Sequence, residues 1–308
     1  MKGGAAAAGR PYRSTRTRQV LLLAGHTWKE GVRRRMILVG FLLTLAFVVL
    51  YALGAYFSFR HFDPSGMGGV SNPALPQLGS EFFRDVAAFQ MLSFGLFISS
   101  FLSAALVVFL AAGMISGDAE NGTLQTIVTR PIARVQILLG RYLGYATIFL
   151  SYLAFLAGSL IAATWLFSGY VPPSPLQSWL LLAAEGLIVL SLVSLGTAVL
   201  PPVATGILVL MAYGLAFIGG VVKQIGLFLG NGTAESIGDA VHYLLPTDAF
   251  FRMSLEGLAP RNLGLFGSFD LGPFGSPSPV RLSTVAFGLV YLLACLTASA
   301  LLFSRRDL

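Results

Sequence analysis

The sequence predicts an all-α integral membrane protein with six transmembrane helices, an amphipathic helix ahead of them and a short helix in a polar loop. Apolar residues make up 56% of the chain and charged residues only 11%, and the mean hydropathy is +0.79. In a soluble domain about a quarter of the residues are charged. Six apolar segments have the length of about 20 residues that a helix needs to cross a bilayer. Basic residues gather beside these segments, as topology determinants do.

The six segments divide residues 36–308 into spans and loops. The predicted spans lie near residues 36–59, 89–112, 142–167, 178–199, 203–222 and 282–303. Two long loops, 60–88 and 223–281, are predicted outside the cell, and Pro201-Pro202 marks a tight hairpin. With the amino terminus inside, 14 of the 20 basic residues are cytoplasmic, as the positive-inside rule requires. The even number of spans then places both termini in the cytoplasm.

The region ahead of the first span has two parts. Residues 1–16 are rich in Gly and Ala and then in Arg, and we expect a disordered basic tail. Residues 17–35 predict an amphipathic helix in which Leu21, Ala24, Trp28 and Val32 share one face. A basic helix with Trp on its apolar face suits the membrane surface. A basic stretch that only sets the orientation of the first span is the alternative.

The polar loop 113–141 contains a pattern that predicts a short helix. Asp118 and Glu120 precede Gly122-Thr123, and Thr123 is a suitable N-cap with acids near the positive helix end. Leu124 begins an apolar face with i, i+3, i+4 spacing. Pro131 ends the helix, because it disfavours the helical conformation at the preceding residue, and Arg134 opens the next apolar run. Such a helix would either rest on lipid headgroups or dock on a partner.

One acid lies inside a predicted span. Glu185 is about two turns, or roughly 10 Å, into the fourth span from its outer end. An ionisable residue at such a depth is costly and often functional. The alternative is structural pairing with a neighbouring helix, for which Lys223 is a candidate partner.

The second long loop has its own pattern. Residues 241–252 mix apolar and polar side chains around Pro246, and they predict short interfacial or re-entrant helices broken at that proline. Residues 260–281 are rich in Gly, Pro and Ser and predict a surface loop.

Several function classes are excluded by what the sequence lacks. No Gly is followed by Lys, so the phosphate-binding loop of an ATPase is absent and any ATPase must be a separate chain. His26, His61 and His242 are far apart, and Cys295 is the single cysteine, so we predict no metal site and no catalytic residues. The basic residues do not form one patch, so no nucleic acid is expected as a partner.

The loop pattern also resembles a known family. The motif consists of the runs GDAENGTL (117–124), RPIAR (130–134) and LGR (139–141). It resembles the signature of ABC type-2 permeases, the membrane subunits of ATP-binding-cassette transporters. Ala133 stands where Ser is usual in that family and Arg141 where Lys is usual, and both keep the local character.

The resemblance implies a function for several segments. The loop helix would be the coupling helix that docks on an ATP-binding-cassette ATPase subunit, and residues 17–35 would be the connector helix. By this resemblance the coupling role belongs to Asp118, Glu120, Gly122, Thr123, Leu124, Pro131 and Arg134. The chain itself would bind no cofactor, because ATP and Mg²⁺ belong to the ATPase.

The same resemblance implies a setting and a direction. The chain would lie in the plasma membrane among lipids and pair with a second permease subunit, either identical or homologous. Family members mostly export, so an exporter is expected.

Two other function classes stay open at this point. A secondary transporter or channel would need no ATPase, and its usual sign is a pair of related halves with charged or broken spans. A membrane assembly subunit could have the same fold without moving a substrate.

Overall fold

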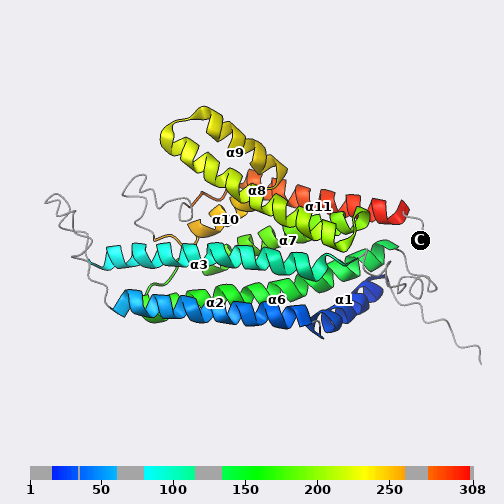
Figure 1. Ribbon diagram of the computed structural model, residues 1–308, viewed down its shortest axis with the longest axis horizontal. Coiled ribbons are helices and arrows are strands. Elements are labelled where there is room, and N and C mark those ends of the chain that lie inside the picture. Colours follow the sequence, from blue (N-terminus) through cyan, green and yellow to red (C-terminus); the bar gives the residue numbers. More distant parts are fainter. Residues whose placement is uncertain (1–15, 34, 61–79, 115–133, 261–276, 306–308) are drawn as a thin grey trace, which may run out of the picture.

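A computed structural model describes residues 16–33, 35–60, 80–114, 134–260 and 277–305, and all regular structure in these ranges is helical (Figure 1). Six helices are long and apolar enough to span a membrane, which confirms the predicted fold class. They are α2 (Arg35–Arg60), α3 (Ser80–Ala111), α6 (Arg134–Ser168), α7 (Pro175–Val199), α8 (Pro202–Leu229) and α11 (Leu282–Arg305).

Two spans begin earlier than their apolar segments predict. α3 begins at Ser80 instead of residue 89, and α6 begins at Arg134 instead of residue 142. The added turns carry polar residues such as Glu81 and Arg84 in α3. Because the backbone bonds of a helix are satisfied internally, the helix continues past the apolar segment that hydropathy detects. Parts of loops 60–88 and 113–141 are therefore helical.

Helix α7 lies at the centre of the bundle and packs against α3, α6, α8 and α11. In its apolar window 67% of the residues are buried, against 17% in both α2 and α11. The tight hairpin at Pro201-Pro202 is present, and its two helices meet where Gly196 contacts Thr205. The peripheral helices expose large apolar side chains, as a membrane-embedded surface should.

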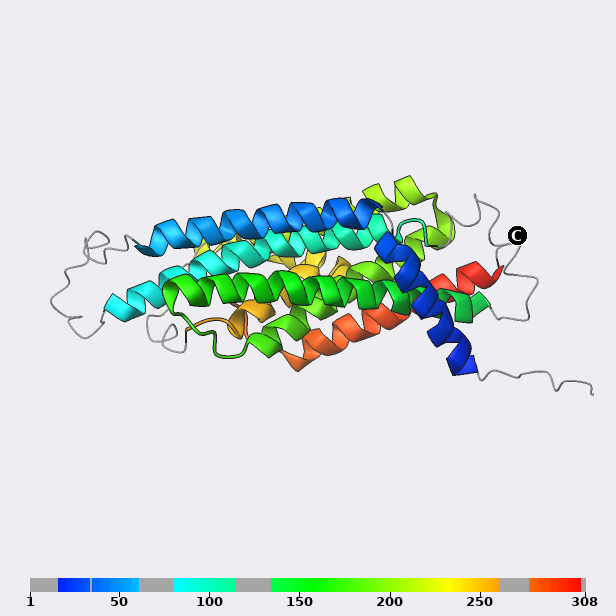
Figure 2. The same cartoon turned by 90° about the horizontal axis from the view of Figure 1, so that it is seen from below.

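Helix α1 (Arg16–Arg33) crosses the first turns of α6, as Figure 2 shows. A Cβ atom on Gly140 would lie 2.6 Å from Cβ of Leu23, and one on Gly144 would lie 2.6 Å from Cβ of Thr27. Small residues at these positions therefore permit close approach of the two helices.

The structure has a helix where the amphipathic helix is predicted, and a face for which no partner was predicted packs on α6. Val20, Leu23, Ala24 and Thr27 approach α6, whereas Leu21 and Trp28 are exposed.

The second long loop forms two short helices, α9 (Gly232–Leu244) and α10 (Thr247–Glu256), and Pro246 lies between them as predicted. α9 folds back along α8, and the glycines of both helices make this possible: a Cβ on Gly226 would lie 2.8 Å from the backbone nitrogen of Glu235. α10 packs against α7. Most of the predicted surface loop, residues 261–276, lies outside the described residues.

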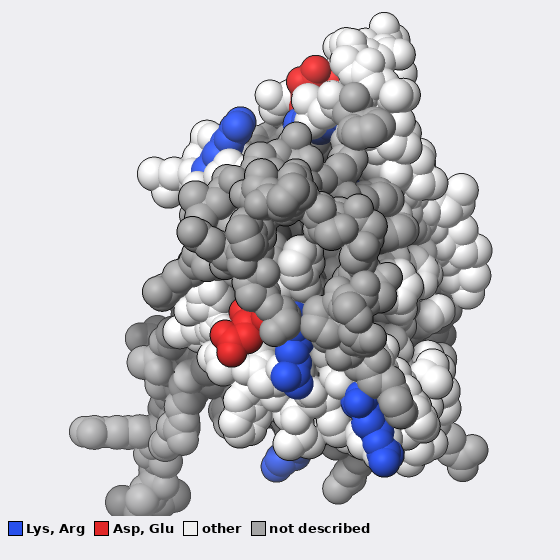
Figure 3. All heavy atoms as spheres, turned by 90° about the vertical axis from the view of Figure 1, so that its left-hand side faces the viewer, with Lys and Arg blue, Asp and Glu red and all other residues white. Residues whose placement is uncertain are grey.

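Different elements lie at the two ends of the bundle. α1, the beginning of α6 and the carboxyl end of α11 lie at one end (Figures 1 and 2). The described side chains that are visible at the opposite end include both Lys or Arg and Asp or Glu (Figure 3). The amino-terminal and carboxyl-terminal helices therefore end on the same side of the bundle.

Candidate functional site

The intramembrane acid Glu185 is the centre of a buried polar cluster. It lies on α7 and is 4% exposed. Its Oε1 atom accepts a hydrogen bond of 2.6 Å from Ser100 Oγ on α3 and one of 2.8 Å from Tyr213 OH on α8. The two hydroxyl oxygens are themselves 2.5 Å apart. Three spans therefore meet at one carboxyl group.

The partner that we predicted for Glu185 is wrong. Lys223 Nζ lies 2.6 Å from Oδ1 of Asp239 on α9 and forms an ion pair with it. Lys223 stands near the end of α8, more than two turns past Tyr213, whose hydroxyl reaches Glu185 instead. Hydroxyl groups on α3 and α8 thus take the place of the predicted cation.

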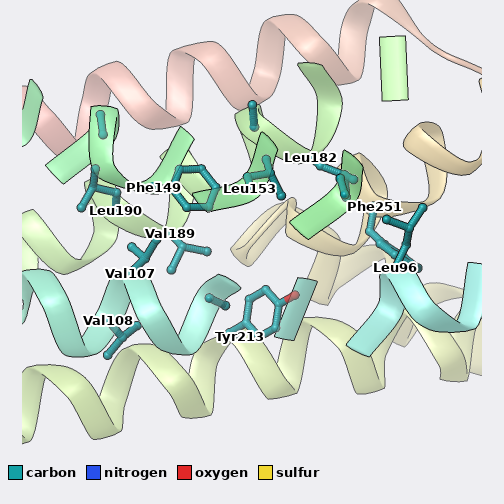
Figure 4. Close-up of a cluster of buried hydrophobic side chains, with 14 of the residues drawn as sticks. Leu96, Val107, Val108, Phe149, Leu153, Leu182, Val189, Leu190, Tyr213 and Phe251 are labelled. Carbon is teal, nitrogen blue, oxygen red and sulfur yellow. The ribbon is translucent and has the colours of Figure 1, made fainter. Parts of the chain in front are cut away.

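Glu185 also lies deeper than predicted. α7 begins at Pro175, so Glu185 follows the start of the helix by ten residues, or about 15 Å. This position is close to the middle of the 25-residue helix. Figure 4 shows Tyr213 among the hydrophobic side chains that surround the cluster.

A small cavity of about 10 Å³ adjoins the cluster. Glu185, Ser99, Ser100, Ser103 and Tyr213 contribute to its wall together with apolar side chains from α3, α6 and α7. Ser103 Oγ is buried and has no hydrogen-bond partner among the described residues. A cavity of this volume has room for about one water molecule, which needs polar partners of this kind.

A larger cavity of about 230 Å³ lies between α3, α6 and α7, and Leu258 also contributes to its wall. Its wall is almost entirely apolar, with Ala157, Ile161 and Leu182 among the lining residues. The indole Nε1 of Trp179, which also lines it, is buried without a hydrogen-bond partner in the described part of the chain. The cavity therefore suits a hydrocarbon group better than a charged one.

The predicted coupling residues divide into two groups. Asp118, Glu120, Gly122, Thr123, Leu124 and Pro131 lie outside the described residues. Arg134 is described: it begins α6 and donates hydrogen bonds to the carbonyl oxygens of Phe303, at 3.5 Å, and Ser304, at 3.2 Å. Arg141 donates to the carbonyl oxygen of Met114, just before the undescribed segment.

A second polar cluster, which the sequence analysis missed, joins α10 to α8. Arg252 Nε donates a hydrogen bond of 2.8 Å to Oδ2 of Asp248, and Arg252 Nη1 donates to Oε1 of Gln224. Asp248 packs directly against the backbone at Gly220. Burial raises the pKa of Asp248, and the neighbouring Arg252 opposes this shift. The i, i+4 spacing of Asp and Arg was the available signal.

The comparison with known families gives a clear result. The model of the ABC-2 family transporter proteins matches residues 21–308, which is nearly the whole chain. A comparison with curated proteins gave no match. The family match covers most of α1, the six spans and the loop that carries the motif. The chain therefore belongs to the ABC-2 transporter family and is a multi-pass membrane permease.

Proposed function

We propose that this permease is the membrane subunit of an exporter in the plasma membrane, with both termini in the cytoplasm. A separate ATP-binding-cassette ATPase would bind ATP and Mg²⁺ and dock on the coupling loop 113–141. Movement of that loop would open and close a pathway formed with a second, identical or homologous permease subunit. This chain supplies the pathway and transmits the movement, and the hydrolysis takes place on the partner.

The anchoring of the coupling loop is the observation that carries this proposal. Arg134 connects the start of α6 to the carboxyl end of α11, and Arg141 connects α6 to Met114, three residues past the end of α3. The glycines at 140 and 144 hold α1 against the same turns of α6. A displacement of the loop would therefore reach four helices at once.

The coupling residues and the export direction rest on the motif and on the family. Asp118 and Glu120 are proposed to face basic groups of the ATPase, since acids ahead of a helix start are available for such pairing. Gly122, Thr123, Leu124 and Pro131 are proposed to form the helix itself. Arg134 is proposed to fix the far end of the loop through its bonds to α11.

The proposal can be tested by purifying the tagged chain from its native membrane in a mild detergent. We expect an ATPase with a phosphate-binding loop to copurify in stoichiometric amount. Glu120→Arg should reduce the amount of copurified ATPase, because it reverses the charge ahead of the docking helix. The membrane content of the chain should stay unchanged.

A matched control separates docking from a general charge effect. Glu81→Arg makes the same charge change at the exposed first turn of α3, at the opposite end of that helix from the coupling loop. This variant should retain the ATPase. Equal retention in both variants would contradict the docking role of Glu120. Absence of any ATPase, under conditions that preserve other membrane complexes, would favour the secondary transporter or channel.

Transport itself needs a second measurement. A membrane assembly subunit would also bind an ATPase, so copurification does not distinguish it from an exporter. ATP-dependent flux in vesicles that contain the purified complex would do so. Flux out of the compartment that corresponds to the cytoplasm would support the exporter, and its absence with every substrate class tested would favour the assembly subunit.

A further inference from the structure

In the cluster around Glu185, three oxygen atoms make three mutual contacts of hydrogen-bond length, but the two hydroxyl groups supply only two hydrogens. Glu185 Oε1, Ser100 Oγ and Tyr213 OH form a triangle with sides of 2.6, 2.8 and 2.5 Å. All three are the lengths of O–H···O hydrogen bonds. Each bond needs one hydrogen, and the two hydroxyl groups supply two. An ionised carboxylate supplies none, so one pair of oxygens would be in contact without a hydrogen between them.

We propose that Glu185 is a proton-binding site whose carboxyl group carries the missing hydrogen at neutral pH and joins α3, α7 and α8. The proton comes from water and returns to water, so the binding step is the conversion of a carboxylate and a hydronium ion into a carboxylic acid and water. This inference concerns the spans alone and does not depend on the proposed ATPase partner.

The charges around the site agree with a neutral carboxyl group. The other residues that line the small cavity, from α3, α6, α7 and α8, are uncharged. Among the described residues, the charged group that interacts with Glu185 is Asp248 on α10, which has the same sign and is paired with Arg252. Tyr213 is the remaining titratable neighbour. An ionised Glu185 would therefore be a buried charge without a cation, which is strongly unfavourable inside a membrane.

The oxygen spacing favours a proton over a metal ion. Oxygens that bind a hard cation such as Ca²⁺ lie about 2.3–2.6 Å from it, so neighbouring ligands at right angles are more than about 3 Å apart. The three oxygens of the cluster are all closer together than that. A hydrogen shared between oxygens explains the spacing, whereas a central ion would push them apart.

The small cavity adjoins the carboxyl group and has room for about one water. The hydroxyl groups of Ser100 and Tyr213 both contact Oε1 of Glu185, not Oε2. Ser103 Oγ, one turn after Ser100 on α3, lines the same cavity as Glu185 and is buried without a hydrogen-bond partner among the described residues. One water in this cavity would satisfy Ser103 Oγ and would lie beside the carboxyl group. Separation of α8 from α3 would break the triangle of oxygens, so proton release is linked to movement of these spans.

Infrared difference spectroscopy of the full chain in lipid nanodiscs tests the proposal directly. At neutral pH we expect a carbonyl stretching band of a protonated carboxylic acid that shifts in heavy water. The band should be absent in Glu185→Gln, whose neutral amide, like a carboxylic acid, can both accept and donate hydrogen bonds. Glu81→Gln, which removes an exposed carboxyl group, should keep the band.

Two further measurements protect the conclusion if Glu185→Gln folds poorly. Tyr213→Phe removes one hydrogen bond and should shift the carboxylic-acid band without abolishing it. Titration of the wild-type band with alkali should remove it at a pH well above that of exposed carboxyl groups. A wild-type spectrum at neutral pH with no carboxylic-acid band would overturn the proposal. Loss of the band on addition of Na⁺ or Ca²⁺ at fixed pH would also overturn it and assign a metal ion to the site.

Discussion

The ion pairs Lys223–Asp239 and Arg252–Asp248 differ in burial, so we expect them to contribute differently to the free energy of unfolding. The side chains of Lys223 and Asp239 are 39% and 45% exposed, and those of Asp248 and Arg252 are both 13% exposed. Arg252→Met leaves Asp248 buried without its cation and should lower the free energy of unfolding by about 3–5 kcal/mol. Lys223→Met should lower it by about 1 kcal/mol or less.

Unfolding of the two variants in mixed micelles, followed by circular dichroism, measures this difference. The two substitutions remove a cation from the same region and introduce the same side chain, so each controls for the other. Equal losses of stability would show that burial does not separate the two pairs.

The lowered pKa of His242 on α9 predicts how the stability of the protein depends on pH. Burial and the nearby Lys223 lower the pKa of His242 below its ordinary value of 6.5. As the pH falls below about 6.5, the unfolded chain binds a proton that the folded chain does not, so stability decreases. His242→Gln should lose less stability than wild type between pH 8 and pH 5. Thermal unfolding of both proteins across this range checks it, and parallel curves would contradict it.

Among single residues, the sequence identifies Glu185 as unusual but does not identify the residues that surround it. Glu185 is conspicuous because it is an acid inside an apolar segment. Its partners are not conspicuous: Ser100 and Tyr213 are ordinary residues of membrane helices, 85 and 28 positions away. Hydropathy carries no information about which faces of distant helices meet. The expectation of a cationic partner therefore indicated Lys223, which instead pairs with Asp239.

The contact between α1 and α6 depends on two glycines, which makes it sensitive to a single methyl group. Gly144→Ala places Cβ about 2.6 Å from Cβ of Thr27 and 2.9 Å from the carbonyl oxygen of Ala24. We expect a loss of about 1–3 kcal/mol in the free energy of unfolding, the usual cost of overpacking. Gly158→Ala is the control, because no atom lies within 4 Å of its added Cβ on the same helix.

The control should show no loss and could gain up to about 1 kcal/mol, since Ala favours helix over Gly. Both variants can be compared by thermal unfolding in the same detergent. If Gly144→Ala were as stable as Gly158→Ala, the close packing of α1 on α6 would be contradicted.

The presence of each helix was easier to predict than the residues at which it begins and ends. Pro246 separates α9 from α10, because a proline in a helix interior removes a hydrogen bond and clashes with the preceding turn. The start of α6 was placed eight residues too late, since Arg134, Gln136 and Arg141 lower the local hydropathy without interrupting the helix. The loop residues 115–133 lie outside the described residues, so the coupling helix stays a prediction.

For the whole molecule, the helix order predicts which residues face each side of the membrane. Ser304, near the carboxyl end of α11, and Ser236, on α9, are both exposed. We expect Ser304→Cys to react with an impermeant thiol reagent only from the cytoplasmic side, and Ser236→Cys only from outside. Both substitutions would be made in Cys295→Ala, which removes the single native cysteine. Labelling of both positions from the same side would contradict the predicted topology.

The central position of α7 could not be predicted from hydropathy. Its apolar window has a mean hydropathy of 2.0, lower than the 2.4 of α2, yet α7 is much more buried. In a membrane, apolar side chains are favourable against lipid as well as against other helices, so hydrophobicity does not mark the core. The number of spans follows from the sequence, whereas their packing order depends on small residues and hydroxyl contacts between distant segments.

The docking of α1 on α6 has a consequence for biosynthesis. α1 leaves the ribosome first, but Gly140 and Gly144, against which Leu23 and Thr27 pack, are synthesised more than a hundred residues later. During that interval the helix lacks its protein partner. Its exposed Leu21, Leu22 and Trp28, together with its basic residues, suit a waiting position on the lipid surface. α1 would then reach its final place only after the third span has been inserted.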